Sequence, residues 1–584
     1  MRLVGVTKWV SGAAMLAAAG GLFSGGCSAS SGSGSGVNNG GNGGNGGSGN
    51  NGGTGGDGFG AFGGSGGQID GGGGSGGNSG GIPESCAQAQ AQKSYLGCEY
   101  WPTVTNNAGL DDGFEFAVVA ANPTKSNADV TVEFQGQVLA TRTIAPGQLD
   151  TIRLPWVTAL KQTFPNFTSG LVQAGAFHVT SSVPITLYQF NPLEFERPGD
   201  ANCPAPCNSF TNDASLLIPT TALGSDYYVM SYPTHHVGQG PTGLGPSQWN
   251  DAPGFLAVTA TEDGTDVTVN SSAYVRSGNG VSALSPGQQG TYSLNRGDVL
   301  VLSSGVMPEQ KTPQPNKPCG TEVTGLGSEA TLCPSPKEYD LTGSRITSNK
   351  PISVIGGHDC TFVPYSRFAC DHLEESMFPT ETLGQDLVVT APQAVASIQS
   401  NPGQADNMFV RVMSAADGNK IDFEPAVNPS VTLNAGEWVE IGPITSDFRI
   451  QSDNRVMVSQ YMVGENFSGQ SAGAGDPSLS IAIPVEQYRL EYTFLAPTTY
   501  TYNFVNVVAP PGAVISIDGA PIDQSRFTPI GNSGFNVARV QVPGGAHAMK
   551  GDKNFGIVVY GYASYTSYMY PGGLNLEKVE IVPR

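Results

Sequence analysis

The sequence predicts an all-β protein built as a tandem array of antiparallel β-sandwich units. Short β-branched segments are separated by turn residues, and long segments with helical periodicity are absent. One phrase, two β-branched runs around a polar turn, also recurs at residues 177–190, 343–360 and 448–461. A β-propeller is the alternative, because repeated antiparallel strands also suit blades. The repeats, at about 90 to 150 residues, are nevertheless long for a blade of about 40 to 50.

The central copy of the phrase shows the expected order of elements. Ile346 precedes a predicted turn at residues 348–351, and Ile352 opens the run that follows it. A polar cluster that ends in Pro is a turn signal. We therefore expect a strand, a turn, a second strand, a loop between Cys360 and Cys370, and a further strand.

The chain divides into six predicted segments. The four units share an order of strands, and alternation is clear where Val130, Val132 and Phe134 fall on one face. The segments are a signal peptide at 1–26, a flexible tether at 27–81, and β-sandwich units at 82–233, 234–397, 398–500 and 501–584.

The N-terminus resembles the signal of a bacterial lipoprotein. Arg2 and Lys8 precede a short apolar core at residues 13–23, and small residues lead to Cys27. In such signals the cysteine becomes the lipidated N-terminus, which predicts an anchor at Cys27. The alternative is an ordinary secretory signal that is cut nearby. Both predict export, to the outer membrane or cell surface if lipidated and to the medium otherwise.

The tether is composed almost wholly of Gly, Asn and Ser, and it cannot bury apolar surface. A coil of about 55 such residues spans roughly 40 Å. No later apolar run is long enough to cross a bilayer, so we expect membrane contact only through an N-terminal lipid. The net charge of −21 argues against nucleic acid as a partner, because an acidic chain repels phosphate.

The cysteines other than Cys27 fall in close pairs, and an even number in an exported chain predicts disulfides. Short spacing favours local bonds over links between distant units. The predicted pairs are Cys86 with Cys98, Cys203 with Cys207, Cys319 with Cys333, and Cys360 with Cys370.

Several long phrases resemble the N-terminal domain of IgGFc-binding proteins. They lie at residues 212–219, 223–232, 340–344, 356–360 and 370–375, and the resemblance runs from Tyr95 to the end of unit three. It implies an extracellular, non-enzymatic binding or adhesion protein that uses no cofactor and has an extracellular protein or glycan as its partner. Since the signal is of bacterial type, antibody is not carried over as the ligand. The alternative class is a structural envelope or matrix protein.

Two loops are the predicted ligand-binding sites, at residues 191–213 in unit one and 358–375 in unit two. Both follow the repeated phrase and both are closed by a predicted disulfide. Aromatic residues and arginine dominate binding hot spots. The candidates are Phe195, Arg197 and Phe210 in the first loop, and Phe362, Tyr365, Arg367 and Phe368 in the second. The alternative is that the disulfides only constrain long loops.

A polar cluster beside the second loop is the candidate for metal or catalytic chemistry. It consists of His358, Asp359, His372, Glu374 and Glu375, which two cysteines would draw together. Imidazoles with a carboxylate can ligate zinc, although the spacing matches no tight metal motif. The same residues are the only ones that suit a secreted hydrolase, and we expect instead a turn of hydrogen-bonded side chains.

Three further patterns are interpreted as structural. Residues 469–473 match Gly-x-Ser-x-Gly, but a loop sequence follows where a nucleophile elbow needs a helix. His235 and His236 lie in a Gly- and Pro-rich connector, where we expect them to be solvated. The C-terminal tyrosines are expected to pack between units, with a carbohydrate-binding surface as the alternative. They are Tyr560, Tyr562, Tyr565, Tyr568 and Tyr570.

The lipoprotein signal yields a direct prediction. In cells fed labelled palmitate, the wild-type protein should incorporate the label and be recovered in the membrane fraction. The Cys27→Ser variant should show neither. Labelling that survives in Cys27→Ser would contradict the anchor.

Overall fold

The computed structural model describes residues 81–582, except 202, 204, 206, 308–318, 326–327, 368–369, 396–402 and 468–473. The predicted signal, Cys27 and all but the last residue of the predicted tether therefore lie outside the described residues, as do Phe368 and residues 469–473. None of the helices in the described ranges combines the length and apolar character needed to cross a membrane.

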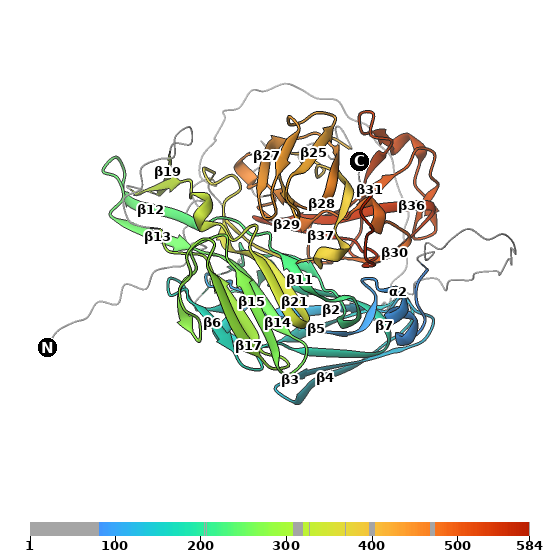
Figure 1. Cartoon of the computed structure of the whole chain (residues 1–584), viewed down its shortest axis with the longest axis horizontal. Helices are drawn as coiled ribbons and strands as arrows, with labels where there is room; N and C mark the ends of the chain where they lie inside the picture. Colours follow the sequence, from blue (N-terminus) through green and yellow to red (C-terminus); the bar gives the residue numbers. More distant parts are fainter. Residues whose placement is uncertain are drawn as a thin grey trace, which may run out of the picture. The chain divides into compact units, whose positions relative to one another are not determined.

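Nearly all regular structure is β, and it is arranged in four units (Figure 1). Unit one contains α2 (Cys86–Gln92), β1 (Gly97–Tyr100), β2 (Phe116–Ala121), β3 (Ala128–Phe134), β4 (Gln137–Ile144), β5 (Leu149–Leu154), α3 (Thr158–Lys161), β6 (Ser169–Val172), β7 (His178–Phe190), β8 (Glu196–Arg197), β9 (Cys207–Asn208) and β10 (Ala214–Leu216). Unit two contains η1 (Thr220–Ala222), β11 (Gly224–Tyr228), β12 (His235–Pro241), β13 (Gln248–Ala252), β14 (Gly254–Ala260), β15 (Thr265–Asn270), β16 (Gly278–Asn279), β17 (Gln289–Leu294), β18 (Val299–Ser303), β19 (Gly320–Gly325), β20 (Ser328–Cys333), η2 (Lys337–Tyr339), β21 (Arg345–Thr361) and β22 (Asp371–Ser376).

Units three and four are shorter. Unit three contains η3 (Thr380–Thr382), β23 (Gly384–Val389), β24 (Met408–Ser414), β25 (Asn419–Glu424), β26 (Val431–Leu433), β27 (Trp438–Ile444), β28 (Phe448–Met462), η5 (Glu465–Phe467) and β29 (Leu479–Ile481). Unit four contains η6 (Val485–Gln487), β30 (Arg489–Ala496), β31 (Tyr502–Ala509), β32 (Ile515–Ile517), β33 (Ala520–Pro521), η7 (Gln524–Arg526), β34 (Thr528–Pro529), β35 (Asn536–Val542), β36 (Gly545–Ala563) and β37 (Thr566–Pro571).

The four units have the same strand order around one long central strand. The orders are β4-β3-β7-β2-β5, β17-β15-β21-β14-β18, β26-β25-β28-β24-β27 and β33-β32-β36-β31-β35. In Figure 1, β14, β15, β17 and β21 lie side by side in the sheet of unit two. All pairs in these strand orders are antiparallel, which confirms the predicted all-β class of antiparallel sandwich units; at the edge of the unit-two sheet, β16 and β6 pair in parallel.

The long strand bends where the sequence predicts a turn. β21 runs unbroken through residues 348–351; its first part pairs with β11 and β15, and its second part with β14 and β22. The predicted turn there is wrong, because the polar residues form a corner at which one strand passes between the two layers of a sandwich. A serine hydroxyl at each corner donates to the carbonyl two residues on. These pairs are Ser181 with Val183 at 2.7 Å, Ser348 with Lys350 at 2.6 Å, and Ser452 with Asn454 at 2.6 Å.

Each predicted unit ends with a strand that belongs to the next sheet. β11 pairs with β21, β23 with β28, and β30 with β36, although the boundaries at 233, 397 and 500 placed these strands one unit earlier. In unit one, β1 occupies the equivalent place beside β7. By hydrogen bonding, units two to four therefore start at β11, β23 and β30, at least ten residues before their predicted starts, whereas unit one starts at β1, after its predicted start.

The last strand of each unit joins a closed ring of four. β10 lies beside β22 and β37, and β29 lies beside the same two strands from the other side. Each ring strand also pairs with the long strand of its own unit. The units are thus sandwiches, while the closure around a central axis resembles that of a propeller.

Two buried carboxyl groups connect the ring strands. Asp213 of unit one accepts hydrogen bonds from the amides of Glu374 and Leu479, each at 3.1 Å, and from the Ser478 hydroxyl at 2.7 Å. These donors come from units two and three. One aspartate therefore links three of the four units.

The second carboxyl group is Asp371 of unit two, and it closes the ring. It accepts from the Asn212 amide in unit one and, in unit four, from the Thr566 hydroxyl at 3.0 Å and the Ser567 amide at 3.4 Å. Units one and four, at opposite ends of the sequence, therefore meet at Asp371.

The segment after β37 crosses three units. Its backbone bonds to unit one near α2, to η3 and to η6. The pairs are the Leu576 amide with the Lys93 carbonyl at 2.7 Å, the Val579 amide with the Glu381 carbonyl at 3.0 Å, and the Asn575 amide with the Gln487 carbonyl at 3.1 Å. Because η3 and η6 follow ring strands, this segment lies at the end of the ring where those strands finish.

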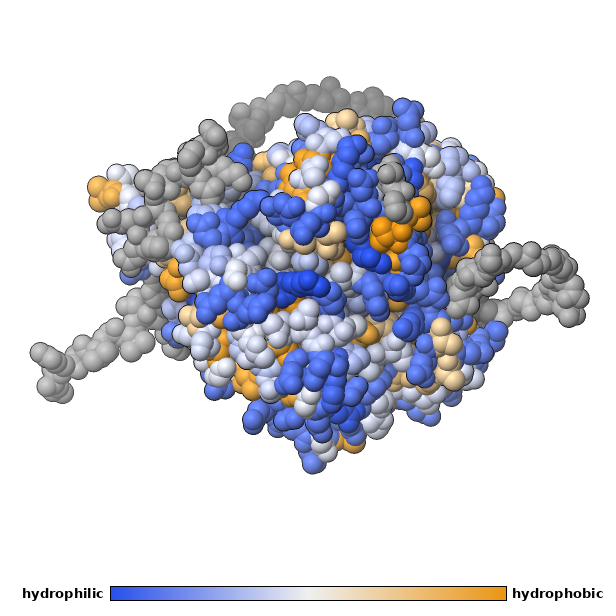
Figure 2. All heavy atoms as spheres, in the orientation of Figure 1, coloured by the Kyte–Doolittle hydropathy of each residue, from blue (hydrophilic) through white to orange (hydrophobic). Residues whose placement is uncertain are grey.

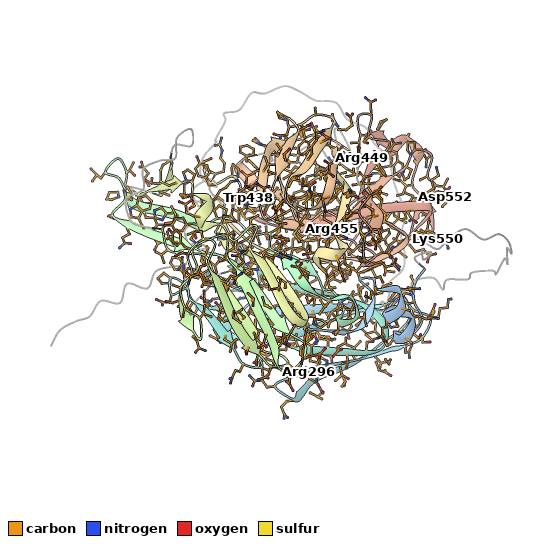
Figure 3. All side chains as sticks on the ribbon, viewed as in Figure 1. Arg296, Trp438, Arg449, Arg455, Lys550 and Asp552 are labelled. Atoms are coloured by element: carbon orange, nitrogen blue, oxygen red, sulfur yellow. A yellow bond between two sulfur atoms is a disulfide. The ribbon has the colours of Figure 1, made fainter. Side chains whose placement is uncertain are left out.

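Cationic side chains also bridge successive units by lying over aromatic rings. In Figure 3, Arg296, Trp438 and Arg449 mark three such contacts. The pairs are Arg296 with Trp101 at 5.0 Å, Lys337 with Trp438 at 3.9 Å, and Arg449 with Phe535 at 5.3 Å from the ring centroid. Contacts of this kind contribute about 0.5–1 kcal/mol each at exposed sites.

The main hydrophobic core is shared by all four units. One cluster of buried side chains includes Tyr188, Leu256, Met457 and Tyr570, one from each unit. The four predicted disulfides are all present, as Cys86–Cys98, Cys203–Cys207, Cys319–Cys333 and Cys360–Cys370. The disulfides close local loops, while burial of apolar surface joins the units.

The ring predicts that Asp213→Ala is strongly destabilising. The substitution leaves three buried donors from units two and three without an acceptor, at about 1–3 kcal/mol each, so we expect a loss of at least about 3 kcal/mol. Urea unfolding measures it, with Asp129→Ala on the exposed side of β3 as the control. Equal stability of the two variants would contradict a structural role for Asp213.

Candidate functional site

The loops that precede the ring strands gather at one end of the ring. Between the long strand and the ring strand lie residues 191–213, 362–370 and 463–478 in units one to three, and a tight turn at 564–565 takes their place in unit four. Contacts between the loops fix their arrangement: the Gly464 amide donates to the Val363 carbonyl at 2.9 Å, and the rings of Phe210 and Tyr565 lie 5.8 Å apart. The two predicted loops also contact each other, because the Asn212 amide donates to Asp371 and the Asn191 side-chain amide lies 3.3 Å from His372 Nε2.

We use the term loop face for the partly exposed aromatic and arginine side chains at this end. Its residues are Phe210, Tyr365, Arg367, Phe467 and Tyr565. Arg367 is exposed, and its guanidinium lies 5.7 Å from the Phe467 ring centroid, across the boundary between units two and three. The loop face thus combines cationic and aromatic groups from all four units.

Three of the other predicted binding residues are engaged inside the protein. Phe362 is buried against Ala330 and Leu332. The prediction that it contacts a ligand is therefore wrong, because its ring lies in the interior, where a partner cannot reach it. Phe195 packs against Tyr500 of unit four, with ring centroids 5.9 Å apart.

Arg197 is also held in place by its neighbours. It pairs with Asp111 and, at 3.0 Å, with Asp200, and it lies 5.4 Å from the Phe114 ring centroid. The remaining predicted residue, Phe368, lies outside the described residues.

The predicted metal and catalytic cluster is buried beneath the loops. His372 Nε2 lies 3.1 Å from the Thr105 hydroxyl, 3.3 Å from the Asn191 amide and 3.5 Å from Glu374 Oε2. Glu374 in turn accepts from Thr105 at 2.6 Å and from Gln189 at 3.2 Å. His372 and Glu374 are 0% exposed, so substrate has no access to this pair and its contacts serve packing between units one and two.

His358 and Asp359 form hydrogen bonds away from the His372–Glu374 pair. His358 Nε2 lies 3.1 Å from the Pro233 carbonyl, and Asp359 accepts from the Ala108 amide at 2.7 Å. Across the described ranges, no group of three or more His, Cys, Asp or Glu side chains is placed to hold a metal ion. The structure brings together His372 and Glu374 and directs the other predicted ligands elsewhere.

Burial dominates the electrostatics of this region. It raises the pKa of the Asp213, Asp371, Glu375 and Asp476 carboxyl groups well above the usual range, and neighbouring carboxylates raise that of Asp371 further. It also raises the pKa of Asp359 from 3.8 to about 6 and lowers that of His358. The ring is therefore built around carboxyl groups that favour the neutral form.

The insertion in unit two was missed by sequence reasoning. β12, β13, β19 and β20 form a separate four-stranded sheet in what the sequence presented as a connector. His235 and His236 are buried there, and His236 stacks on Trp249 with ring centroids 4.3 Å apart, so the expectation of solvated histidines was wrong. The strands at 235–241 and 248–252 are rich in Gly and polar residues and show no apolar–polar alternation, so no local pattern marked them.

The C-terminal tyrosines pack as predicted. Four of the five are buried, and Tyr565 alone among them is half-exposed, on the loop face. In the view of Figure 2, hydrophobic residues form small separate patches among hydrophilic ones. The loop face is the region where aromatic side chains from all four units reach the surface together.

The fold and the loops define an extracellular-type binding module, in which a disulfide-bonded β scaffold presents loops at one end. A sequence model described as IgGFc binding protein matches residues 213–561, more than half of the chain. The chain belongs to this family. The match begins at Asp213 and ends within β36, so it spans three ring strands. A comparison with curated proteins finds no similar sequence.

The raised carboxyl pKa values predict that stability falls as pH rises. Below about pH 4 Asp359 is protonated in both states. Between about pH 4 and 6 the unfolded chain ionises this carboxyl whereas the folded chain keeps its proton, so stability falls, and above about pH 6 both states are ionised and the loss is complete. A shift of about two pKa units corresponds to roughly 3 kcal/mol.

Unfolding free energies measured from pH 4 to 8 test this effect. Asp359→Asn keeps an acceptor for the Ala108 amide, and it should reduce the fall in unfolding free energy between pH 4 and 6. Asp266→Asn, at an exposed position, is the control and should leave this fall unchanged. An unchanged pH profile in Asp359→Asn would contradict the assignment.

Proposed function

We propose that the protein is a surface-displayed, non-enzymatic binding protein that recognises an extracellular protein through its loop face. The observation that carries the proposal is the convergence of four loops at one end of the ring, with aromatic and arginine side chains on a rigid support. The loop-face side chains remain partly exposed, and aromatic residues and arginine are common binding hot spots.

The mode of display follows from the N-terminal sequence. Lipidation at Cys27 holds the chain to the outer membrane or cell surface, and the tether sets the folded body away from the bilayer by roughly 40 Å. Adhesion is the role that suits an anchored binding module. The four disulfides and membership of the IgGFc binding protein family support an extracellular location.

The loop face favours a protein over a glycan as its main partner. Arg367 and Phe467 form one pair and Phe210 and Tyr565 another, on opposite sides of the ring. Two separated anchor points suit an extended partner surface. An envelope or matrix protein without a saturable ligand is the alternative outcome of the test.

An array of extracellular proteins, with the immunoglobulin G Fc fragment as one arm, tests the proposal on the full chain. For any ligand found, the double variant Tyr365→Ala/Arg367→Ala should weaken binding at least about tenfold, or about 1.4 kcal/mol. The melting temperature should hardly change, because the Arg367 side chain is exposed and Tyr365 is only half-buried.

The matched control is Val138→Ala/Arg142→Ala on the outer edge strand β4, which should bind as wild type does. Equal affinity of the loop-face variant and the wild type would move the site elsewhere. Failure of every array arm would favour the structural alternative.

A further inference from the structure

Unit two carries a hollow of about 500 Å³ that the loop face does not include. Its walls come from residues 274–277 after β15, 283–285 before β17 and 305–306 after β18, with Phe167 of unit one and Tyr339 completing the lining. Tyr274 and Val306 are exposed at its surface, by 41% and 63%. The volume is within the range of sites that bind small molecules.

Among the described residues of the lining, Arg276 alone is charged. Its Nε donates to the Ser304 carbonyl at 2.7 Å, and its guanidinium lies 5.6 Å from the Phe167 ring centroid. Nη2 is buried without a hydrogen-bond partner, and within the described residues no carboxylate comes within ion-pair distance of Arg276. A guanidinium that is partly removed from water and lacks a counter-ion is stabilised by an anion.

The neighbouring charged groups do not provide a counter-ion for Arg276. Asp251 and Asp359 act on it only at longer range, and burial outweighs them, so that its pKa is lowered. Asp359 accepts from the Ala108 amide at 2.7 Å and Asp251 pairs with His236, so both carboxylates have other partners. An anionic group that enters the hollow is therefore the natural counter-ion for Arg276.

Two tyrosine rings form an apolar wall beside the guanidinium. The rings of Tyr274 and Tyr339 lie 5.2 Å apart at 38°, and Gly305 passes close behind them. A Cβ at Gly305 would lie 2.6 Å from Tyr274 Cβ and 3.4 Å from Tyr339 Cδ1, so only glycine allows this approach. Tyr274 is the exposed ring of this wall, Tyr339 is buried against it, and Ser277 and Ser285 belong to the same lining.

We propose that this hollow binds an acidic sugar unit, with its carboxylate on Arg276 and the apolar face of its ring on Tyr274 and Tyr339. A guanidinium attracts a carboxylate by its charge, aromatic faces accept the C–H groups of a pyranose, and Ser277 and Ser285 supply hydroxyl groups for the ring substituents. A single acidic unit fits better than a polyanion, because the chain carries a net charge of −21.

Isothermal titration of the full chain with four small ligands tests the proposal. Glucuronic acid and N-acetylneuraminic acid carry both a ring and a carboxylate, glucose lacks the carboxylate, and N-acetylalanine carries a carboxylate without the ring. At least one acidic sugar should bind at least about tenfold more tightly than glucose and N-acetylalanine do. No binding of either acidic sugar, or equal binding of glucose or N-acetylalanine, would overturn the proposal.

Variants locate the site. Arg276→Gln should weaken binding of the acidic sugar at least about tenfold, while Lys553→Gln, the same change at an exposed lysine of unit four, should leave it unchanged. Tyr274→Ala, at an exposed position, should weaken it several-fold, and it decides the matter if Arg276→Gln fails to fold. Wild-type affinity in Tyr274→Ala would overturn the assignment. The loop-face variant Tyr365→Ala/Arg367→Ala should bind the sugar normally, so failure of one site does not decide the other.

Discussion

The hydrogen bonds of Asp213 and Asp371 are the constraint on which the rest of the structure depends. Each carboxyl group is buried in the interior of the ring, where it accepts from the next amide of its own chain segment and otherwise from donors of other units. A buried carboxyl without these donors would be costly. The four sandwiches must therefore assemble together, and the hydrophobic cluster that they share reinforces this requirement.

The ring also determines where function can lie. It directs the loops of all four units to one end, and the segment after β37 covers units near the other end. Unit two departs from the common pattern, because it contains the additional sheet of β12, β13, β19 and β20 and the hollow beside Arg276. The loop face is therefore formed by equivalent loops of all four units, whereas the hollow beside Arg276 is a feature of unit two.

Local features were predictable from the sequence, whereas distant contacts were not. The alternation of Val130 and Val132 identified a buried face, and short cysteine spacings identified the four disulfides, because both depend on neighbours in the chain. The corner at Ser348 was interpreted as a turn, because polar residues followed by proline occur both in turns that reverse the chain and in corners within a strand.

The site was only partly predictable for the same reason. The sequence placed both candidate loops correctly after the repeated phrase, but the burial of Phe362 depends on the insertion that contributes Ala330 and Leu332. The contact of Asp371 with Ser567 spans nearly 200 residues and leaves no local trace. Arg276 was overlooked because its lack of a counter-ion is visible only when its neighbours are placed around it.

The closing contact between Leu576 and Lys93 has a mechanical consequence. In a linear string of domains, a pull at one end loads each domain in series, and the string lengthens as the domains open in turn. Here a pull that enters near Lys93 is divided at once between unit one and the C-terminal segment, which is bonded in turn to η3 and η6. The load is carried in parallel, so the folded body should resist extension as one piece until a single cooperative rupture.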